Sequence, residues 1–194
     1  MKVVLVEYNA GNYRSVICAL NRLGIFPEVS ADPATIRRAD RVIFPGVGEA
    51  STTMQYLHSS GLSSVIVSLT QPILGICLGM QLLCKASEEN DTECLNCFSE
   101  QVRRFRQMRK IPHIGWNEVY KLTGPLFEGI PEGSHCYFVH SYYVSVGAHT
   151  TAETIYGESF SASIQSGNRF AVQFHPEKSG EVGAQILNNF LRLE

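Results

Sequence analysis

The sequence lacks an excess of charge of either sign. Its 194 residues include 16 Lys and Arg against 18 Asp and Glu, which gives a formal net charge of −2. This balance argues against a surface that binds nucleic acid or an acidic membrane. Charged residues make up only 18% of the chain and apolar residues 44%, so we expect a globular protein rather than a disordered one.

Uninterrupted hydrophobic runs are also missing. Residues 62–84 carry no formal charge, but Pro72, Gly75, Gly79 and several polar residues interrupt them. We therefore expect a buried helix, a turn and a strand here, and no membrane-spanning segment. Internal repeats, low-complexity stretches and linkers are absent as well, and the length suits a single domain over residues 1–194.

Six cysteines are too few for a disulfide framework in a chain of this length. No secretory signal is recognisable before them, because the chain opens into the strand-like MKVVLVEY. We therefore expect reduced thiols and a cytoplasmic protein. The pair Cys94-x-x-Cys97 lacks the two further ligands of a structural zinc site, so we expect no metal and no cofactor, and its role stays open.

The first half of the chain alternates between strand and helix patterns. Buried strands are predicted at 3–6, 25–29 and 41–44, and helices from Asn12 as cap to Gly24 as stop, from Asp32-Pro33, around 54–57 and at 63–69. In the second half, strands are predicted at 101–105, 117–122, 136–144, 150–156, 159–165 and 169–174, followed by a last helix around 182–190. This order predicts an α/β fold: a mostly parallel central sheet flanked by helices, with a smaller antiparallel extension.

A cysteine lies between two glycines where a strand pattern turns into a helix pattern, at Gly75-Ile76-Cys77-Leu78-Gly79. This G-x-nucleophile-x-G form is typical of a nucleophile elbow, in which a Cβ at either glycine would clash. The elbow places the sulfur at a helix N-terminus, which favours the thiolate. From these five residues alone, a buried cysteine in a packed turn is an equally good interpretation.

A base for this nucleophile is found at the end of another predicted strand, in the segment RFAVQFHPEK. His175 lies 175 − 77 = 98 residues after Cys77, so only the fold can bring the two together. Both residues follow predicted strands, whose carboxyl ends form the usual site of an open α/β sheet. Two residues later, Glu177 can hold the far imidazole nitrogen and orient the ring.

Taken together, these motifs resemble the pattern of class I glutamine amidotransferases, G-x-C-x-G-x-Q followed by a distant H-P-E. Residues 8–16 (YNAGNYRSV), 112–117 (PHIGWN) and 137–142 (YFVHSY) are similar, within that class, to the glutaminase subunits of imidazole glycerol phosphate synthases. Glu7, Asn9 and the segment 93–101 depart from the pattern of those subunits. The resemblance runs nearly end to end and implies a flavodoxin-like core.

The resemblance also implies roles for individual residues. Cys77, His175 and Glu177 would hydrolyse glutamine through a thioester; Leu78, Val47 and Gly48 would form the oxyanion hole; Gly46, Gln81, Ser141 and Tyr142 would bind glutamine; and Trp116, Asn117, Tyr137 and Lys178 would meet a partner. That partner is the cyclase subunit of the synthase, a (β/α)8 barrel, in a heterodimer that uses the ammonia for histidine biosynthesis. The resemblance further implies that the loop 45–48 keeps the glutaminase nearly idle until the partner and its nucleotide bind.

Three other interpretations remain open at this point. The chain could serve another synthase, for anthranilate or aminodeoxychorismate, although PHIGWN argues against this. It could be a catalytically silent scaffold that only occupies a synthase, although all three triad residues are present. It could also be a cysteine peptidase, which the His-Pro-Glu triplet disfavours.

Overall fold

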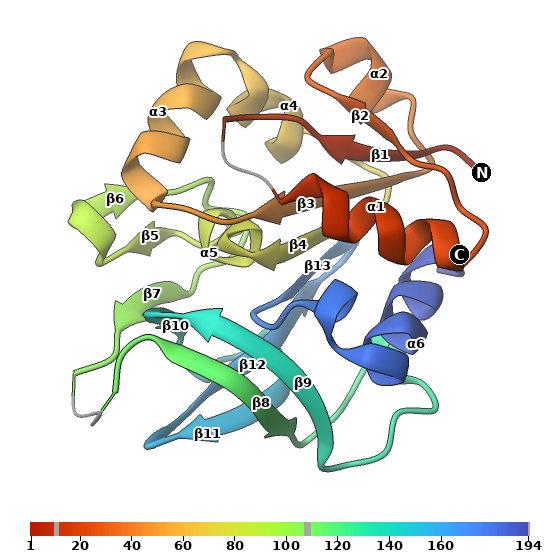
Figure 1. Cartoon of the computed structure of the whole chain (residues 1–194). Helices are drawn as coiled ribbons and strands as arrows, with labels where there is room; N and C mark the ends of the chain where they lie inside the picture. Colours follow the sequence, from red (N-terminus) through yellow and green to blue (C-terminus); the bar gives the residue numbers. More distant parts are fainter. Residues whose placement is uncertain (10–11, 107–109, 194) are drawn as a thin grey trace.

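The protein was analysed as a computed structural model, which describes residues 1–9, 12–106 and 110–193. Five parallel strands form its core, in the order β2 (Glu28–Ser30), β1 (Val3–Val6), β3 (Arg41–Gly46), β4 (Ile73–Cys77) and β13 (Arg169–Val172) (Figure 1). The parallel strands have their carboxyl ends at one edge of the sheet, where β3, β4 and β13 lie side by side. Sites in α/β folds form at such edges.

Beyond β13 the same sheet continues through antiparallel strands. They are β12 (Glu158–Ser166), which also pairs with β11 (Thr150–Tyr156), then β10 (Tyr142–Val144) and β7 (Gln101–Arg104). The edge is formed by β5 (Ala86–Ser87), parallel to β7, and β6 (Thr92–Glu93). A separate antiparallel pair, β8 (His113–Val119) and β9 (Ser134–His140), lies across the antiparallel part (Figure 1).

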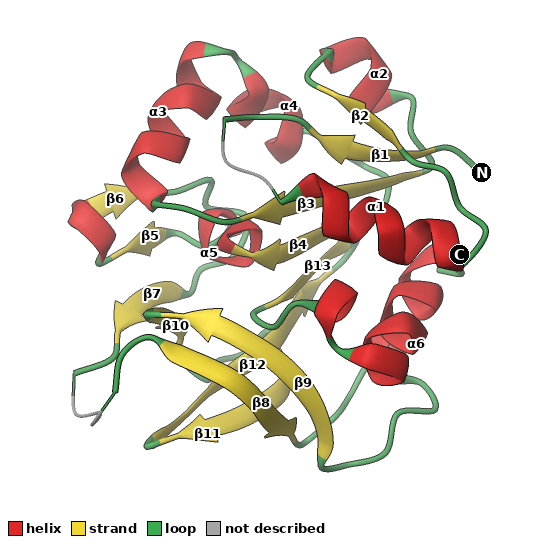
Figure 2. Cartoon of the chain, viewed as in Figure 1, coloured by secondary structure: helices red, strands yellow, loops and turns green. Residues whose placement is uncertain are grey.

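Helices cover both faces of the parallel core (Figure 2). One face packs against α1 (Tyr13–Arg22) and α6 (Gly180–Leu191), and the other against α2 (Pro33–Arg37), α3 (Ala50–Ser59), α4 (Leu62–Val67) and α5 (Leu78–Leu83). Successive strand residues point to opposite faces, so Val3 and Leu5 join the first cluster while Val4 and Val6 join the second. Short 3-10 helices lie at Glu89–Asp91, Pro125–Phe127 and Pro176–Lys178.

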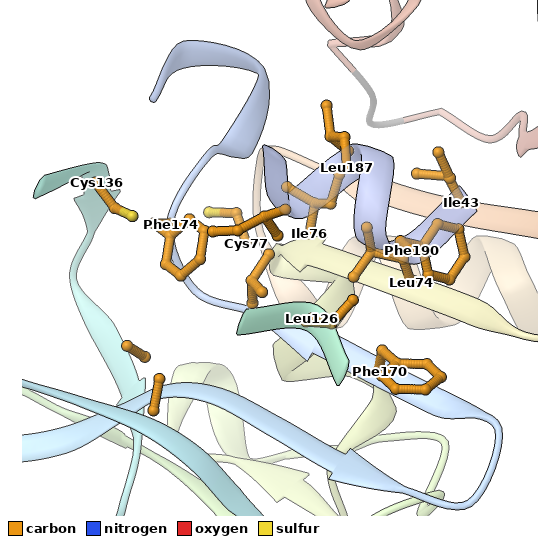
Figure 3. Packing of buried hydrophobic residues seen from close by; sticks show 14 of the residues in the cluster. Ile43, Leu74, Ile76, Cys77, Leu126, Cys136, Phe170, Phe174, Leu187 and Phe190 are labelled. Atoms are coloured by element: carbon orange, nitrogen blue, oxygen red, sulfur yellow. The ribbon is translucent and has the colours of Figure 1, made fainter. Parts of the chain in front are cut away.

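The hydrophobic cluster between the sheet and helices α1 and α6 reaches the carboxyl edge of the sheet. Its members include Leu74 and Ile76 of β4 together with Leu187 and Phe190 of α6 (Figure 3). Cys77, the last residue of β4, belongs to the same cluster and lies beside Ile76 and Phe174 (Figure 3). The packed core therefore holds the residue at the end of β4 in place, and positions within such a core adjust little.

The structure confirms the predicted fold class and corrects three predicted strands. The strand predicted at 25–29 is formed by Glu28–Ser30, because Pro27 has no N–H to donate to a neighbour. The strand predicted at 117–122 starts earlier and ends at Val119, before the chain turns through Lys121 at φ 53°. The segment 136–144 is two strands in different sheets, β9 and β10, because the pairing partner changes at Ser141.

The other predicted elements lie close to their expected positions. Asp32 caps α2 by accepting a hydrogen bond from the backbone of Thr35 at 2.7 Å. Asn12 precedes α1 as expected, but its side chain makes no capping hydrogen bond. Ala10 and Gly11, which belong to the motif at 8–16, lie outside the described residues. In the described ranges, no helix combines the length and the apolar character needed to cross a bilayer.

Candidate active site

Cys77 occupies a strained backbone position at the junction of β4 and α5. Its φ and ψ are 55° and −108°, outside the regions that residues with a Cβ commonly adopt. A residue held in such a region costs about 1–3 kcal/mol and persists only where the surrounding structure imposes it. Strain of this kind is typical of active sites and agrees with the elbow predicted from the sequence.

Both glycines of the elbow are required by close packing. A Cβ on Gly79 would overlap the carbonyl group of Phe44 in β3. A Cβ on Gly75 would lie 2.8 Å from Cδ1 of Leu83 and 3.0 Å from the carbonyl group of Gly79. The prediction that a side chain at either position would clash is confirmed.

His175 reaches the same edge of the sheet from β13. The strand ends at Val172, three residues earlier, and the backbone N–H of His175 then donates to the carbonyl of Tyr137 in β9 at 2.9 Å. The hydroxyl of Ser179 donates to the carbonyl of His175 at 2.7 Å and accepts from the N–H of Tyr137 at 3.0 Å. These bonds tie the backbone of His175 to β9 and so fix the position from which the imidazole projects.

Glu177 orients this imidazole. Its Oε1 lies 2.8 Å from Nδ1 of His175, and both side chains are at most 3% exposed. The two residues meet through the 3-10 turn Pro176–Lys178, which follows β13. With its proton on Nδ1, the neutral ring keeps Nε2 free to take a proton from a neighbour.

Cys77 and His175 line one cavity and interact. Burial by itself lowers the pKa of His175, but its hydrogen bonds to Cys77 and Glu177 outweigh burial and raise the pKa to about 10. The imidazole can therefore hold the proton that the thiol releases at neutral pH. The structure thus joins in space two residues 98 positions apart, and their arrangement is that of a nucleophile, a base and an orienting carboxylate.

Replacing Glu177 with glutamine should lower the pKa of His175 by about one unit or more, because it removes the negative charge that favours the imidazolium. The raised pKa stabilises the fold below pH 6.5, and this contribution is lost as the pH rises through about 10. The pKa of His175 is measured as the midpoint of an NMR titration of its ring. Glu118→Gln, which faces the exposed His135, is the matched control and should not move that midpoint. A wild-type midpoint near 6.5 would contradict the assignment.

The cavity at this edge has a volume of about 340 Å³, within the usual range for small-molecule sites. It brings together nine of the residues singled out in the sequence: Val47, Gly48, Cys77, Leu78, Gln81, Ser141, Tyr142, His175 and Lys178. Gly46 is not on its wall, because the space that a Cβ would need there is filled by Tyr8, Leu78 and Gly79. Gly46 therefore allows β3 to pack against the elbow and does not make room for a ligand.

Four further residues of the cavity wall had been given no individual role from the sequence. Glu89, Pro112, Val139 and His140 also line it. Glu89 accepts a hydrogen bond from the N–H of Ala50 at 2.8 Å, and its partial burial raises its pKa. Glu89 lies in a short turn with no periodic pattern, so no local signal distinguishes it from a solvated carboxylate.

The loop after β3 forms another wall. Val47 is 40% exposed, and Gly48 has a φ of 124°, which favours glycine. The hydroxyl of Tyr8, a buried residue, donates to the carbonyl of Pro45. The start of the loop is therefore held by Tyr8, which follows β1, whereas Val47 and Gly48 are exposed.

The outer face of the β8–β9 pair carries an apolar patch at its end next to the cavity. Ile114 and Trp116 are 54% and 55% exposed, so core packing of Trp116 is excluded. The ring of Trp116 lies 5.9 Å from that of Tyr137, and Nζ of Lys178 lies 5.9 Å from the Tyr137 ring centre. The amide of Asn117, by contrast, is bonded inside the chain, to the carbonyl of Ile155 at 2.9 Å.

The remaining thiols give no sign of a metal centre. All six cysteines are free, and burial raises the pKa of Cys94 to about 12 and that of Cys97 above its usual value. Within the part of the chain that the structure describes, no group of three or more Cys, His, Asp and Glu could hold a metal ion.

Comparison with known proteins agrees with this geometry. The family model of class I glutamine amidotransferases matches residues 4–193. This chain is a class I glutamine amidotransferase. It is 53% identical over 196 residues to the protein named imidazole glycerol phosphate synthase subunit HisH in Bacteroides thetaiotaomicron, with 100% of each chain covered. It is 44% identical to the protein of that name in Yersinia pseudotuberculosis, again with 100% of each chain covered.

Solved structures share the fold of this amidotransferase at lower identity. A crystal structure described simply as a glutamine amidotransferase superposes with a TM-score of 0.76 at 20% identity, covering 97% of this chain and 96% of that one. The PurLQS structure from Thermotoga maritima gives 0.72 at 17% identity, with 98% and 97% covered. These likenesses establish the class I amidotransferase fold and nothing more specific.

Proposed function

We propose that this chain is the glutaminase subunit of an imidazole glycerol phosphate synthase, which hydrolyses glutamine to glutamate and ammonia for histidine biosynthesis. The observation that carries the proposal is the Cys77–His175–Glu177 arrangement at a cavity of amino-acid size. Full-length similarity to subunits named for that synthase supports the choice of pathway. We take residues 1–194 as one amidotransferase domain acting in the cytoplasm, where free thiols persist.

The first half of the reaction forms a thioester. The thiolate of Cys77 attacks the side-chain carbonyl carbon of glutamine, and a C–S bond forms while the carbonyl oxygen gains the negative charge. His175 has taken the thiol proton and returns it to the departing nitrogen. The C–N bond breaks, ammonia leaves, and the glutamyl group stays on the sulfur.

The second half returns the enzyme to its starting state. His175 takes a proton from water, the hydroxide attacks the thioester, and the C–S bond breaks to release glutamate. In both halves the oxyanion would be met by the N–H of Leu78 and an N–H of Val47 or Gly48. One such donor contributes about 2.7–4 kcal/mol to transition-state stabilisation.

The charges around the cavity suit an amino acid. Glu89 supplies a carboxylate for the α-ammonium group of glutamine. Both amide hydrogens of Gln81 are used inside the protein, on the carbonyl of Tyr142 and on Gln173, each at 3.0 Å. Gln81 can therefore offer a substrate only its carbonyl oxygen. Ser141 and Tyr142, which also line the cavity, would complete the binding site.

We propose that the exposed face of β8–β9 docks the cyclase barrel in a heterodimer. The pairs Ile114–Val139 and Trp116–Tyr137 lie side by side across the two strands and form an apolar patch next to the cavity. Aromatic anchors of this type dominate the affinity of protein interfaces. Lys178 borders both the patch and the cavity, whereas Asn117, with its amide bonded internally, would support the patch from behind.

Partner binding would also set the activity. Tyr8 holds the carbonyl of Pro45, so the part of the loop free to reorient is Val47–Gly48. In the idle state a carbonyl, and not an N–H, would point into the oxyanion hole. Binding of the cyclase and its nucleotide would favour the reverse orientation, which is a conformational gate of the usual kind.

Mixing the chain with a candidate cyclase and its nucleotide tests this proposal. Glutamate release should rise by about 100-fold or more over the isolated chain, because one restored oxyanion donor contributes about that much. Trp116→Ala should abolish the rise without altering the fold, while Phe26→Ala, which removes another exposed aromatic far along the sequence, should leave it intact. Activation by a synthase for anthranilate or aminodeoxychorismate instead would assign the chain to that pathway, and no release with any partner would make it a silent scaffold.

A further inference from the structure

One buried polar side chain beside the nucleophile, Gln173, has no part in the two half-reactions above. It follows β13, is 0% exposed, and its backbone N–H donates to the carbonyl of Ala162 at 2.8 Å. Its side-chain Oε1 accepts from Nε2 of Gln81 at 3.0 Å, and its Nε2 lies 3.7 Å from Sγ of Cys77. A buried amide is costly unless both of its ends are bonded, so these two contacts define its position.

The orientation of this amide follows from a backbone carbonyl. The carbonyl of Tyr142 can only accept, and Gln81 contacts it at 3.0 Å, so Gln81 must turn its nitrogen that way. The same nitrogen also donates to Gln173, so Gln173 must accept through its side-chain oxygen. The nitrogen of Gln173 is then the atom that faces the sulfur of Cys77.

The carbonyl of Tyr142 is itself held in place by a pair of buried histidines. Nδ1 of His140 donates to it at 2.7 Å, and Nε2 of His140 lies 2.9 Å from Nδ1 of His113. Burial lowers the pKa of His140 to about 3 and that of His113 to about 4, so both rings are neutral at pH 7. The anchor that orients Gln81 and Gln173 therefore does not titrate in the working range.

The sulfur of Cys77 has two different neighbours in this arrangement. The carbonyl of Val139, at 3.7 Å, can accept the proton of the thiol but offers nothing to a thiolate. The N–H of Gln173 can donate to the thiolate, and a hydrogen bond to the charged form favours that form. Loss of the proton thus exchanges the Val139 contact for the Gln173 contact without movement of the chain.

We propose that Gln173 stabilises and aims the thiolate of Cys77 through this N–H, and that Gln81 acts on the nucleophile by orienting Gln173. The proposal rests on the proposed function, since it assigns a part in the activation of the same nucleophile. Cys77 would then interact with two groups: the base His175, which takes its proton, and the N–H of Gln173, which donates to the resulting thiolate. The proposal also gives Gln81 a role that does not depend on substrate.

Alkylation of Cys77 by iodoacetamide tests this in the isolated full chain, with the modified peptide quantified by mass spectrometry. Gln173→Met keeps the volume and removes the donor, so the pH midpoint of Cys77 alkylation should rise by about one unit, which lowers the alkylation rate near neutral pH by up to about tenfold. Gln165→Met, the same change on β12, is the matched control and should not move the midpoint. The titratable groups that face Cys77 or line its cavity are unchanged in these variants: His175, Glu177, His140, Tyr8, Tyr142, Glu89 and Lys178.

A double-mutant comparison tests the role of Gln81. Gln81→Met should raise the pH midpoint of Cys77 alkylation by less than Gln173→Met does. The amide of Gln173 stays near the sulfur in this variant but loses the partner that orients it. The double variant should match Gln173→Met alone, since Gln81 acts only through Gln173. Additive shifts would overturn this part of the proposal.

A Gln173→Met midpoint within about 0.3 units of wild type, in a variant with an unchanged thermal unfolding midpoint, would overturn the role of Gln173. If that variant does not fold, Gln173→Asn withdraws the amide by one methylene and should give the same shift; an unshifted midpoint would again overturn it. Glutamate release by the wild-type chain mixed with the cyclase is measured in a separate experiment, which tests the proposed function. An unshifted midpoint alongside normal release removes this inference alone, and a shifted midpoint without release removes the proposed function alone.

Discussion

Replacing Cys77 with alanine should lower glutamine hydrolysis by the complete synthase by more than about 10⁴-fold, because loss of the nucleophile of a triad removes almost all of its rate enhancement. Without the sulfur no thioester can form, and neither His175 nor water in the cavity can replace it. Glutamate release at saturating glutamine, with cyclase and nucleotide present, measures the effect. The fold should survive, since the change removes one sulfur atom and with it two long contacts of 3.7 Å, to Val139 and Gln173.

Two comparisons separate chemistry from structure in this experiment. Cys84→Ala removes another buried thiol, at the far end of the same short helix, and should leave the rate within a few-fold of wild type. Free ammonia supplied to the Cys77→Ala complex should still support the cyclase reaction if the heterodimer assembles. Substantial glutamate release by the alanine variant would end the thioester mechanism.

Replacing Gly79 with alanine should destabilise the protein by about 3 kcal/mol or more, or prevent it from folding, because overpacking against backbone cannot be relieved by a rotamer change. The added methyl would overlap the carbonyl group of Phe44 in β3. Elsewhere in a helix the same change is stabilising by about 1 kcal/mol, so the sign of the effect is diagnostic. Denaturant unfolding monitored by circular dichroism gives the free energy.

Gly24→Ala is the matched control for this second prediction. Gly24 follows α1 with φ at 78°, and a Cβ there would have nothing within 4 Å. Its loss should cost only the left-handed backbone penalty of about 1–2 kcal/mol. A Gly79→Ala protein as stable as wild type would show that β3 and the elbow are less tightly packed than the structure has them.

Most of the fold was predictable because its signals are local. The buried strand at Val3–Val6, the cap of Asp32 on α2 and the elbow around Cys77 each depend on a few neighbouring residues. Such patterns follow from side-chain periodicity and from backbone geometry. The break at Ser141 had no local signal, since aromatic and β-branched residues continue on both sides of it while the pairing partner changes from β8 to β7 and β12.

The site was predictable to the extent that its members carry recognisable chemistry in a recognisable spacing. Cys77, His175 and Glu177 could be singled out from their motifs. Glu89 and Gln173 could not, because an acidic residue in a turn and a glutamine at the end of a strand are unremarkable until their neighbours are known. Gly46 was assigned to the ligand side, and the structure instead places Tyr8 and Leu78 where its side chain would be.

The sequence alone singled out Cys77 as a candidate nucleophile, because two glycines at a change from strand to helix are typical of an elbow. It also determined which histidine and carboxylate were available as a pair, since two residues of separation limit how they can meet. Only the tertiary structure decided that the sulfur and the imidazole face one cavity, and that a buried amide stands behind the sulfur. Those contacts join β4, β9 and β13, and strands so far apart in the chain become neighbours only when the sheet forms, through pairing that no short stretch of sequence encodes.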